Sequence, residues 1–199
     1  MFSFNLDKLI HSIIFFVKNT DPHKLGKVKL MKLLFFSDFR HMERYGRPIT
    51  GDTYIKLDHG PVPSLSLDLI SEAETCFNDL PDDEDLADTK DYVQKIKSSI
   101  SISPKDFYGR KKLVFTPLVE FNPKFFSKSD LLILKEVADE FYSHNGKQVS
   151  KKSHTEPAWM LPEMYSQIDY RYALGVETLD YYSYWEKTVD SFRKVITLA

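Results

Sequence analysis

Residues 45–63, with the sequence YGRPITGDTYIKLDHGPVP, decide how this chain folds. The stretch holds three of the chain's 7 glycines and three of its 10 prolines. Glycine permits a positive φ and a close backbone approach, whereas proline fixes φ near about −65° and disfavours helix in the residue before it. We therefore predict that residues 59–63 form an extended, sharply shaped loop, and not a helix or a central strand.

Helical patterns lie on both sides of this stretch. Residues 27–45 are apolar nearly all round, which is typical of a helix buried on most sides, so we predict that they form the central helix and that Gly46 ends it. Residues 6–19 follow the i, i+3, i+4 spacing of an amphipathic helix, with Asn5 or Asp7 as its N-cap. A third helix is predicted to begin just after Pro63.

Four lysines crowd the start of the predicted central helix, where the helix dipole disfavours cations. They are Lys24, Lys27, Lys29 and Lys32. Two interpretations are open: a solvated helix face, or a small patch that faces an anion or an acidic group. Asp38 and His41, three residues apart on the same helix, form a weak pair of metal-ligand types.

The β-structure is predicted to be small. Residues 53–57 alternate as in a strand, and residues 112–120 are rich in β-formers, with Pro117 marking an edge position. Each segment needs a partner, so we expect the two to pair. The predicted fold class is mainly α with a small antiparallel β element (α+β). We expect one compact domain over residues 1–199, built around the buried central helix.

The remaining segments carry local signals. Residues 78–91 hold seven acidic side chains and no glycine, which argues against an EF-hand loop and favours a variable, solvated acidic linker. A modest helix is predicted across the far end of this linker, and residues 101–104 are predicted to break it. Ser127 and Asp130 form a variant capping box that starts a helix, and Asn145-Gly146 is predicted to end it. Residues 149–160 are predicted to be a short helix and a turn at Pro157, and residues 176–197 a final long helix.

Composition bounds the class of protein. The net charge of −2 and the pI of about 6.3 do not suggest a nucleic-acid-binding protein. The single cysteine, Cys76, fits a reducing cytoplasm, and the N-terminus lacks a basic region, a cleavage site and the roughly 20 apolar residues that a membrane span needs. We predict a cytoplasmic protein without a membrane partner. Aromatic residues make up 14% of the chain, which favours a partner-binding face.

No motif for catalysis, a cofactor or a metal is present. The six histidines form no HExxH or HxH pattern, and GxSxG, CxxC and glycine-rich phosphate loops are missing. We therefore predict a protein that is not an enzyme and needs no cofactor, with an unrecognised site at Asp38, His41 and His59 as the alternative. His59 and His154 each lie beside constraining residues. Either their rings fix loops, or both residues lie on a partner-binding surface.

Two stretches carry a resemblance to a known family. Residues 29–63, KLMKLLFFSDFRHMERYGRPITGDTYIKLDHGPVP, resemble the signature of the Panacea-domain (SocA-like) antitoxins of bacterial and phage toxin–antitoxin systems, and residues 153–159, SHTEPAW, match a later segment of that signature. The family-motif positions, which are also candidates for partner binding, are Lys32, Leu33, Leu34, Gly46, Thr50, Gly51, Asp52, Tyr54, His59, Gly60, Pro61, Val62, Ser153, His154 and Trp159.

The resemblance implies a mostly helical fold and a role without catalysis. It implies that the chain binds a cognate toxin protein and neutralises it. An adaptor that delivers a bound client or toxin to a cytoplasmic protease is the alternative. Autoregulation through DNA would have to use the basic tracts at residues 24–32 and 110–112, neither of which contains an identifiable recognition helix.

Overall fold

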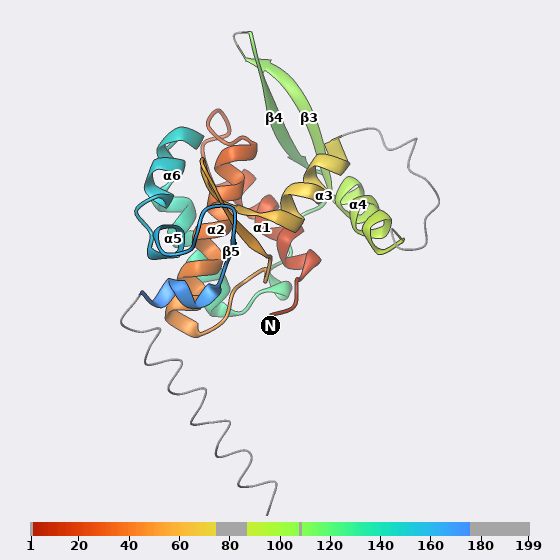
Figure 1. Cartoon of the computed structure of the whole chain (residues 1–199). Coiled ribbons are helices and arrows are strands. Elements are labelled where there is room, and N and C mark those ends of the chain that lie inside the picture. The colour runs from red at the N-terminus through yellow and green to blue at the C-terminus, as the bar shows by residue number, and fades with distance from the viewer. Residues whose placement is uncertain (1, 75–86, 108, 176–199) are drawn as a thin grey trace, which may run out of the picture.

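Helix α2 (Lys27–Tyr45) lies at the centre of the fold, with the other elements packed around it (Figure 1). The computed structural model describes residues 2–74, 87–107 and 109–175. The other helices are α1 (Leu6–Asn19), α3 (Ser64–Glu74), α4 (Ala87–Ser99), α5 (Lys128–Glu140), α6 (Gly146–Ser153) and α7 (Pro157–Met160), with 3-10 turns η2 (Pro123–Phe125) and η3 (Tyr170–Leu174). The strands are β1 (Tyr54–Leu57), β2 (Gly60–Pro63), β3 (Ile100–Phe107), β4 (Arg110–Pro117) and β5 (Gln167–Ile168).

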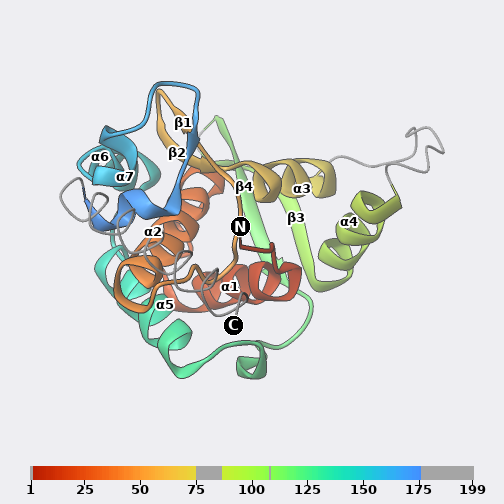
Figure 2. The ribbon, with the colours of Figure 1, turned by 60° about the horizontal axis from the view of Figure 1, so that its bottom comes forward.

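The central position and the bounds predicted for α2 are confirmed. Gly46 ends the helix with φ of 71°, a left-handed conformation that glycine adopts at little cost, and its N–H bonds the carbonyl of Met42. Figure 2 shows α1, α2 and α5 packed together, and the apolar side chains of all three contribute to one core. Asn5 caps α1 by accepting a hydrogen bond from the Lys8 N–H at 2.9 Å.

The predicted strand pairing is wrong, although the class, mainly α with small antiparallel sheets, is confirmed. β1 pairs with β2, with Tyr54 opposite Pro63, and with β5, with Tyr54 opposite Ile168, so the order is β2-β1-β5. β4 pairs instead with β3, with Ile100 opposite Pro117. The β1–β2 hairpin reverses through two residues, Asp58 and His59, and a short loop closure has a small entropic cost. The β3–β4 hairpin projects from the helical body (Figure 1).

Three further boundaries differ from the sequence predictions. α5 ends at Glu140, and Asn145 instead caps the start of α6, because its side chain accepts from the Gln148 N–H while the Gln148 side chain bonds the Asn145 N–H. The modest helix predicted across the far end of the acidic linker is present as α4, and it begins at residue 87, inside the predicted linker. Residues 101–104 follow the end of that helix but continue as β3. The rest of the linker and the predicted final helix lie outside the described residues.

The segment after the central helix adopts the extended shape that its prolines predict. Residues 60–63 form β2, an edge strand, and α3 begins immediately after Pro63. In the parts of the chain that the structure describes, no helix is long and apolar enough to cross a membrane. Buried polar and charged side chains interrupt the apolar core, and most of them surround residues 45–63.

Candidate functional site

The family-motif residues converge on two buried polar clusters beside α2. Among them Lys32, Thr50, Asp52, Tyr54, Gly60, Pro61 and Ser153 are buried, whereas Gly46 and His59 are exposed. Val62, His154 and Trp159 are half-buried. Most of the motif therefore lies beneath the surface.

The first cluster is built on Asp38, which is fully buried in α2. Its carboxylate accepts from the backbone N–H groups of Ile49 at 2.8 Å and Thr50 at 2.7 Å, from the Thr50 hydroxyl, and from the hydroxyls of Tyr54 at 3.0 Å and Tyr170 at 3.2 Å. Burial raises the pKa of Asp38, and these hydrogen bonds oppose the rise. Asp38 thus holds the turn after α2 against β1 and η3.

Asp52 holds the start of α3 by accepting backbone hydrogen bonds, as Asp38 holds the turn after α2. Its carboxylate accepts from the N–H groups of Leu65 at 3.2 Å and Ser66 at 2.8 Å and from the Ser66 hydroxyl, so it satisfies free donors in the first turn of that helix. Burial raises the pKa of Asp52 as well. Between these two aspartates Gly51 has φ of 73°, and a Cβ there would collide with the Ser3 carbonyl.

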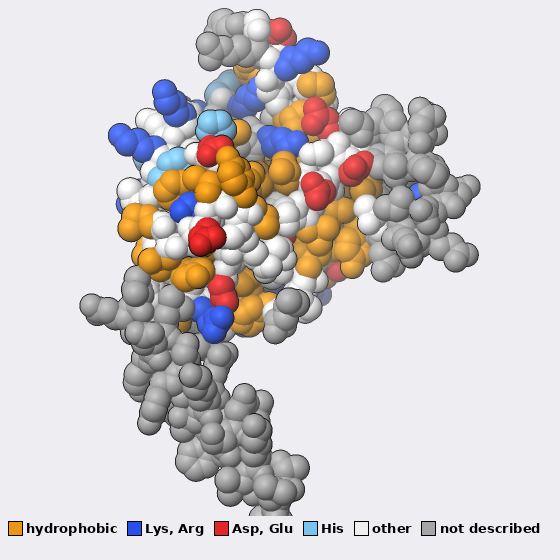
Figure 3. Space-filling view, viewed as in Figure 1, with side chains coloured by type: hydrophobic (Ala, Val, Ile, Leu, Met, Phe, Trp, Pro, Cys, Tyr) orange, Lys and Arg blue, Asp and Glu red, His pale blue; other side chains and the backbone are white. Residues whose placement is uncertain are grey.

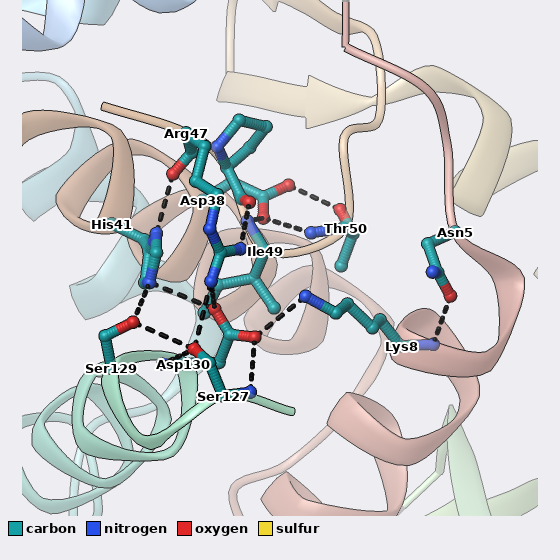
Figure 4. A network of polar contacts seen from close by, with 11 residues as sticks. Asn5, Lys8, Asp38, His41, Arg47, Ile49, Thr50, Ser127, Ser129 and Asp130 are labelled. Carbon is teal, nitrogen blue, oxygen red and sulfur yellow. Dashed lines mark hydrogen bonds and ion pairs between the residues drawn. The ribbon is translucent and has the colours of Figure 1, made fainter. Parts of the chain in front are cut away.

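Asp130 joins this region to α1 and α5, as Figure 4 shows. The buried carboxylate lies 2.8 Å from Lys8 Nζ, 2.8 Å from Arg47 Nη2 and 3.0 Å from His41 Nε2, and it accepts from the Ser127 N–H at 3.0 Å. Burial alone would raise the pKa of Asp130. The hydrogen bonds from His41, Lys8 and Ser127 outweigh burial and lower it well below its usual range.

Asp38 and His41 therefore face different partners. His41 Nδ1 lies 2.7 Å from the Arg47 carbonyl, which can only accept, so Nδ1 carries the hydrogen. Across the described ranges no group of three or more His, Cys, Asp or Glu side chains could hold a metal ion. Asp38 and His41, the pair of metal-ligand types, thus serve to hold the residues that follow α2.

The second cluster surrounds Gly60 and Lys32. Lys32 Nζ is buried and donates to the Pro61 carbonyl at 2.6 Å, and burial lowers its pKa to about 7. Gly60 has φ of 98°, and a Cβ at this position would lie 2.6 Å from Ser153 Oγ and 3.0 Å from Lys32 Nζ. Only glycine fits between these groups.

Neither interpretation of the four lysines holds for Lys29 and Lys32. Lys29 is also buried, and its Nζ donates to the Tyr142 carbonyl at 3.0 Å. Burial lowers the pKa of Lys29 to about 8. Both side chains satisfy backbone carbonyls of neighbouring segments, a function that helix periodicity does not reveal. Lys24 is exposed and Lys27 is half-buried.

His154 and Trp159 cover the second cluster. Their rings stack with centroids 4.1 Å apart, and Trp159 Nε1 donates to the Leu57 carbonyl at 3.2 Å. Burial and the nearby Lys32 lower the pKa of His154. His59 is exposed, and its carbonyl accepts from the Ser150 hydroxyl at 2.5 Å. His154 thus contributes to loop packing, whereas the His59 ring lies at the surface.

Sequence reasoning missed several members of these clusters. Lys8, Tyr170 and Ser66 were not candidates, although they bond Asp130, Asp38 and Asp52. Asp130 was flagged only as a helix cap, a function that the structure confirms. No local pattern identifies such partners, since Lys8 and Asp130 are 122 residues apart in the chain.

A groove of about 740 Å³ adjoins the Asp52 region. Its lining combines residues from the N-terminal segment, from the region around Asp52 and from residues 167–171. The Asp52 carboxylate is occupied by α3, and Asp169 forms an ion pair with Arg171 at 2.7 Å. The charged side chains that line the groove, Asp52, Asp169 and Arg171, thus already bond within the protein.

The fold and these clusters define an α+β scaffold in which the motif residues build the interior. Residues 30–160 match the family described as "Antitoxin SocA-like, Panacea domain". The match covers more than half of the 199 residues, and the chain belongs to this family. Comparisons with curated proteins and with solved structures find no match.

Proposed function

We propose that this chain is a cytoplasmic antitoxin that binds a cognate toxin protein and neutralises it by direct contact, without catalysis. Membership of the SocA-like antitoxin family over residues 30–160 is the observation that carries this proposal. The burial of most motif residues supports it further, because a scaffold with an internally satisfied polar core leaves its surface free to differ between partners. The toxin-contacting surface would then include few of the motif residues.

Co-expression with the product of the adjacent open reading frame tests this function. That product alone should arrest growth, and the full-length chain should restore it and co-purify with the toxin. A neighbouring product that is harmless alone, or one that stays toxic beside this chain, would contradict the proposal.

An adaptor function differs from simple neutralisation in what happens to the toxin. If the chain delivers the toxin to a protease, the toxin's half-life should shorten when the chain is present and recover when the protease is removed. With blocking alone, the half-life stays unchanged while growth is restored. Growth rescue by a His59→Ala variant would argue against the alternative of an enzyme that uses this side chain.

A further inference from the structure

The amino-terminal ends of α2 and α6 lie side by side. A Cβ on Gly146, the first residue of α6, would lie 3.2 Å from the Val28 Cβ in the first turn of α2. At the other end of α6, Ser153 lies beside Lys32, one turn further along α2, because Ser153 Oγ and Lys32 Nζ would both lie within 3.0 Å of a Cβ on Gly60. The two helices therefore run in the same direction. Parallel helices add their dipoles, and the ends that meet here are the positive ones.

Lysines add positive charge to these helix ends. Lys24, Lys27 and Lys147 lie at or just before the two first turns, and neither first turn contains an acidic residue. The α2 N-cap, Gly26, makes no side-chain capping bond. Asp21, 4.0 Å from Lys24 Nζ, offsets only part of this charge. Acidic residues are usually preferred at helix starts, whereas lysines stand here. Nothing in the local helix geometry requires lysines at these positions.

Two exposed apolar side chains lie among these lysines. Val28 is 54% exposed and Tyr142 is 52% exposed. The backbone beneath Tyr142 is held in place, since its carbonyl accepts from Lys29 Nζ at 3.0 Å and from the Asp21 N–H at 3.4 Å, and the adjacent Ser143 carbonyl accepts from Lys24 Nζ at 2.6 Å. An exposed aromatic on a fixed loop, with Lys24 bonded to the next residue, has the composition of a protein interface.

We propose that this surface, which we call the basic end (Lys24, Lys27, Val28, Tyr142 and Lys147), docks an acidic segment of the toxin. The inference rests on the proposed antitoxin function and adds the chemistry of the partner. Carboxylates of the toxin would lie at the two helix ends, and an apolar side chain between them would cover Val28 and Tyr142. Figure 3 shows Lys, Arg and His side chains gathered at the upper edge of the molecule, near α6 and the connection into α2.

A protein partner fits this surface better than a nucleic acid does. Val28 and Tyr142 give it an apolar centre, whereas affinity for nucleic acid comes mainly from cations that contact phosphates. The chain's net charge of −2 also opposes binding to a polyanion. A short acidic segment matches a small positive area on a chain that is otherwise slightly acidic.

The proposal is tested by measuring how tightly the purified product of the neighbouring gene binds the full-length chain, as the wild type and as the variant Lys24→Glu/Lys147→Glu. Glutamate is favourable near a helix start, which offsets the loss of the Lys24 hydrogen bond to the Ser143 carbonyl, so the variant should fold about as well as the wild type even though toxin binding weakens. We expect about a tenfold or larger loss of affinity at 50 mM NaCl, mostly in the association rate, and a smaller difference at about 500 mM NaCl. Tyr142→Ala should weaken binding at both salt concentrations.

Matched controls change the same charge and the same kind of side chain elsewhere. Lys124→Glu/Lys128→Glu alters two exposed lysines near the start of α5, and Leu132→Ala removes an exposed apolar side chain from that helix. Both should bind like the wild type. If the wild type does not bind the gene product, the proposed function fails. If the wild type binds and Lys24→Glu/Lys147→Glu binds equally well, only the basic-end proposal fails.

Other occupants of the basic end give different results. Salt-sensitive binding of the wild type to a fluorescent DNA duplex, abolished by the double variant, would overturn the proposal in favour of nucleic acid. Self-association that the double variant abolishes, measured by analytical ultracentrifugation without the toxin, would overturn it in favour of a second copy of this chain.

Discussion

Asp130 and Lys32 are both ionisable side chains that folding removes from water, but their surroundings differ. Asp130 lies within 3.0 Å of three potential cations, Lys8, His41 and Arg47, and its pKa is lowered, which favours its charged form. Lys32 donates to one carbonyl and contacts no carboxylate in the described structure, and its pKa is lowered to about 7, which disfavours its charged form. Burial alone therefore does not determine whether a charge stabilises the fold; its partners do.

The largest effect is expected from Asp130→Ala. The substitution leaves Lys8, His41 and Arg47 without their shared acceptor and removes the capping box of α5, so the free energy of unfolding should fall by about 3–5 kcal/mol. Urea unfolding at pH 7 measures the loss. Lys135→Ala, which removes an exposed partner of Asp139, is the control and should stay within about 0.5 kcal/mol. A similar, small effect for both variants would mean that the Asp130 cluster adds little.

Gly60→Ala probes the close packing around Lys32. The new Cβ would meet Ser153 Oγ and Lys32 Nζ in a backbone with φ of 98°, so we expect a destabilisation of about 3 kcal/mol. Gly109→Ala has a comparable φ of 77° but no atom within 4 Å, and it should cost only about 1 kcal/mol. Thermal unfolding distinguishes strain in the backbone from collision with neighbours. Equal losses for the two variants would show that the space beside Lys32 is not tight.

The pH dependence of stability sharpens the contrast between the two charges. Because the pKa of Lys32 is about 7 in the folded protein and 10.5 in the reference state, the unfolded chain binds the proton more tightly between these values. The contribution of Lys32 should therefore rise with pH from about 7 to 10, with a slope on the order of 1 kcal/mol per pH unit. Lys32→Met should flatten this rise in urea unfolding measured at several pH values, whereas exposed Lys151→Met should not. Identical profiles for the wild type and Lys32→Met would contradict the lowered pKa.

Tyr170→Phe is expected to have the smallest effect of this set. The Tyr170 hydroxyl donates to buried Asp38 or to the Asp52 carbonyl, so its removal should cost about 1 kcal/mol. Tyr165 makes a comparable bond to Asp58 at 3.0 Å at the surface, and Tyr165→Phe should produce no measurable change because water replaces the bond. Urea unfolding of the Tyr170→Phe and Tyr165→Phe variants shows whether the burial of a hydrogen bond, and not its length, decides how much it stabilises the fold. A loss as large in Tyr165→Phe would mean that burial does not matter here.

Local signals predicted the helices better than the sheets. The bounds of α2 followed from an apolar run that Gly46 ends, and the start of α5 followed from Ser127 and Asp130. The predicted strand pairing was wrong because the β-character of residues 53–57 and 112–120 does not determine which strands pair. The position of Asn145 was misinterpreted for a similar reason, since asparagine can end one helix or cap the next.

The candidate site was predicted only as a set of residue types. Gly51, Gly60 and Pro61 were recognised as constrained positions, and the structure shows the atoms that constrain Gly51 and Gly60. The burial of Lys29 and Lys32 could not be predicted, because it depends on the carbonyls of Tyr142 and Pro61, which other segments bring to them. The same holds for Lys8 and Asp130, which helix packing alone brings together.

The sequence by itself determined the central helix, the capping box of α5, the constrained segment at residues 45–63 and the resemblance to SocA-like antitoxins. These depend on backbone preferences and on spacing between nearby residues, which are properties of short stretches of chain. Only the tertiary structure decided which strands pair, which charges are buried and that the starts of α2 and α6 meet at one surface. Such features arise from contacts between distant segments, whose energies depend on what surrounds each group and not on its place in the chain.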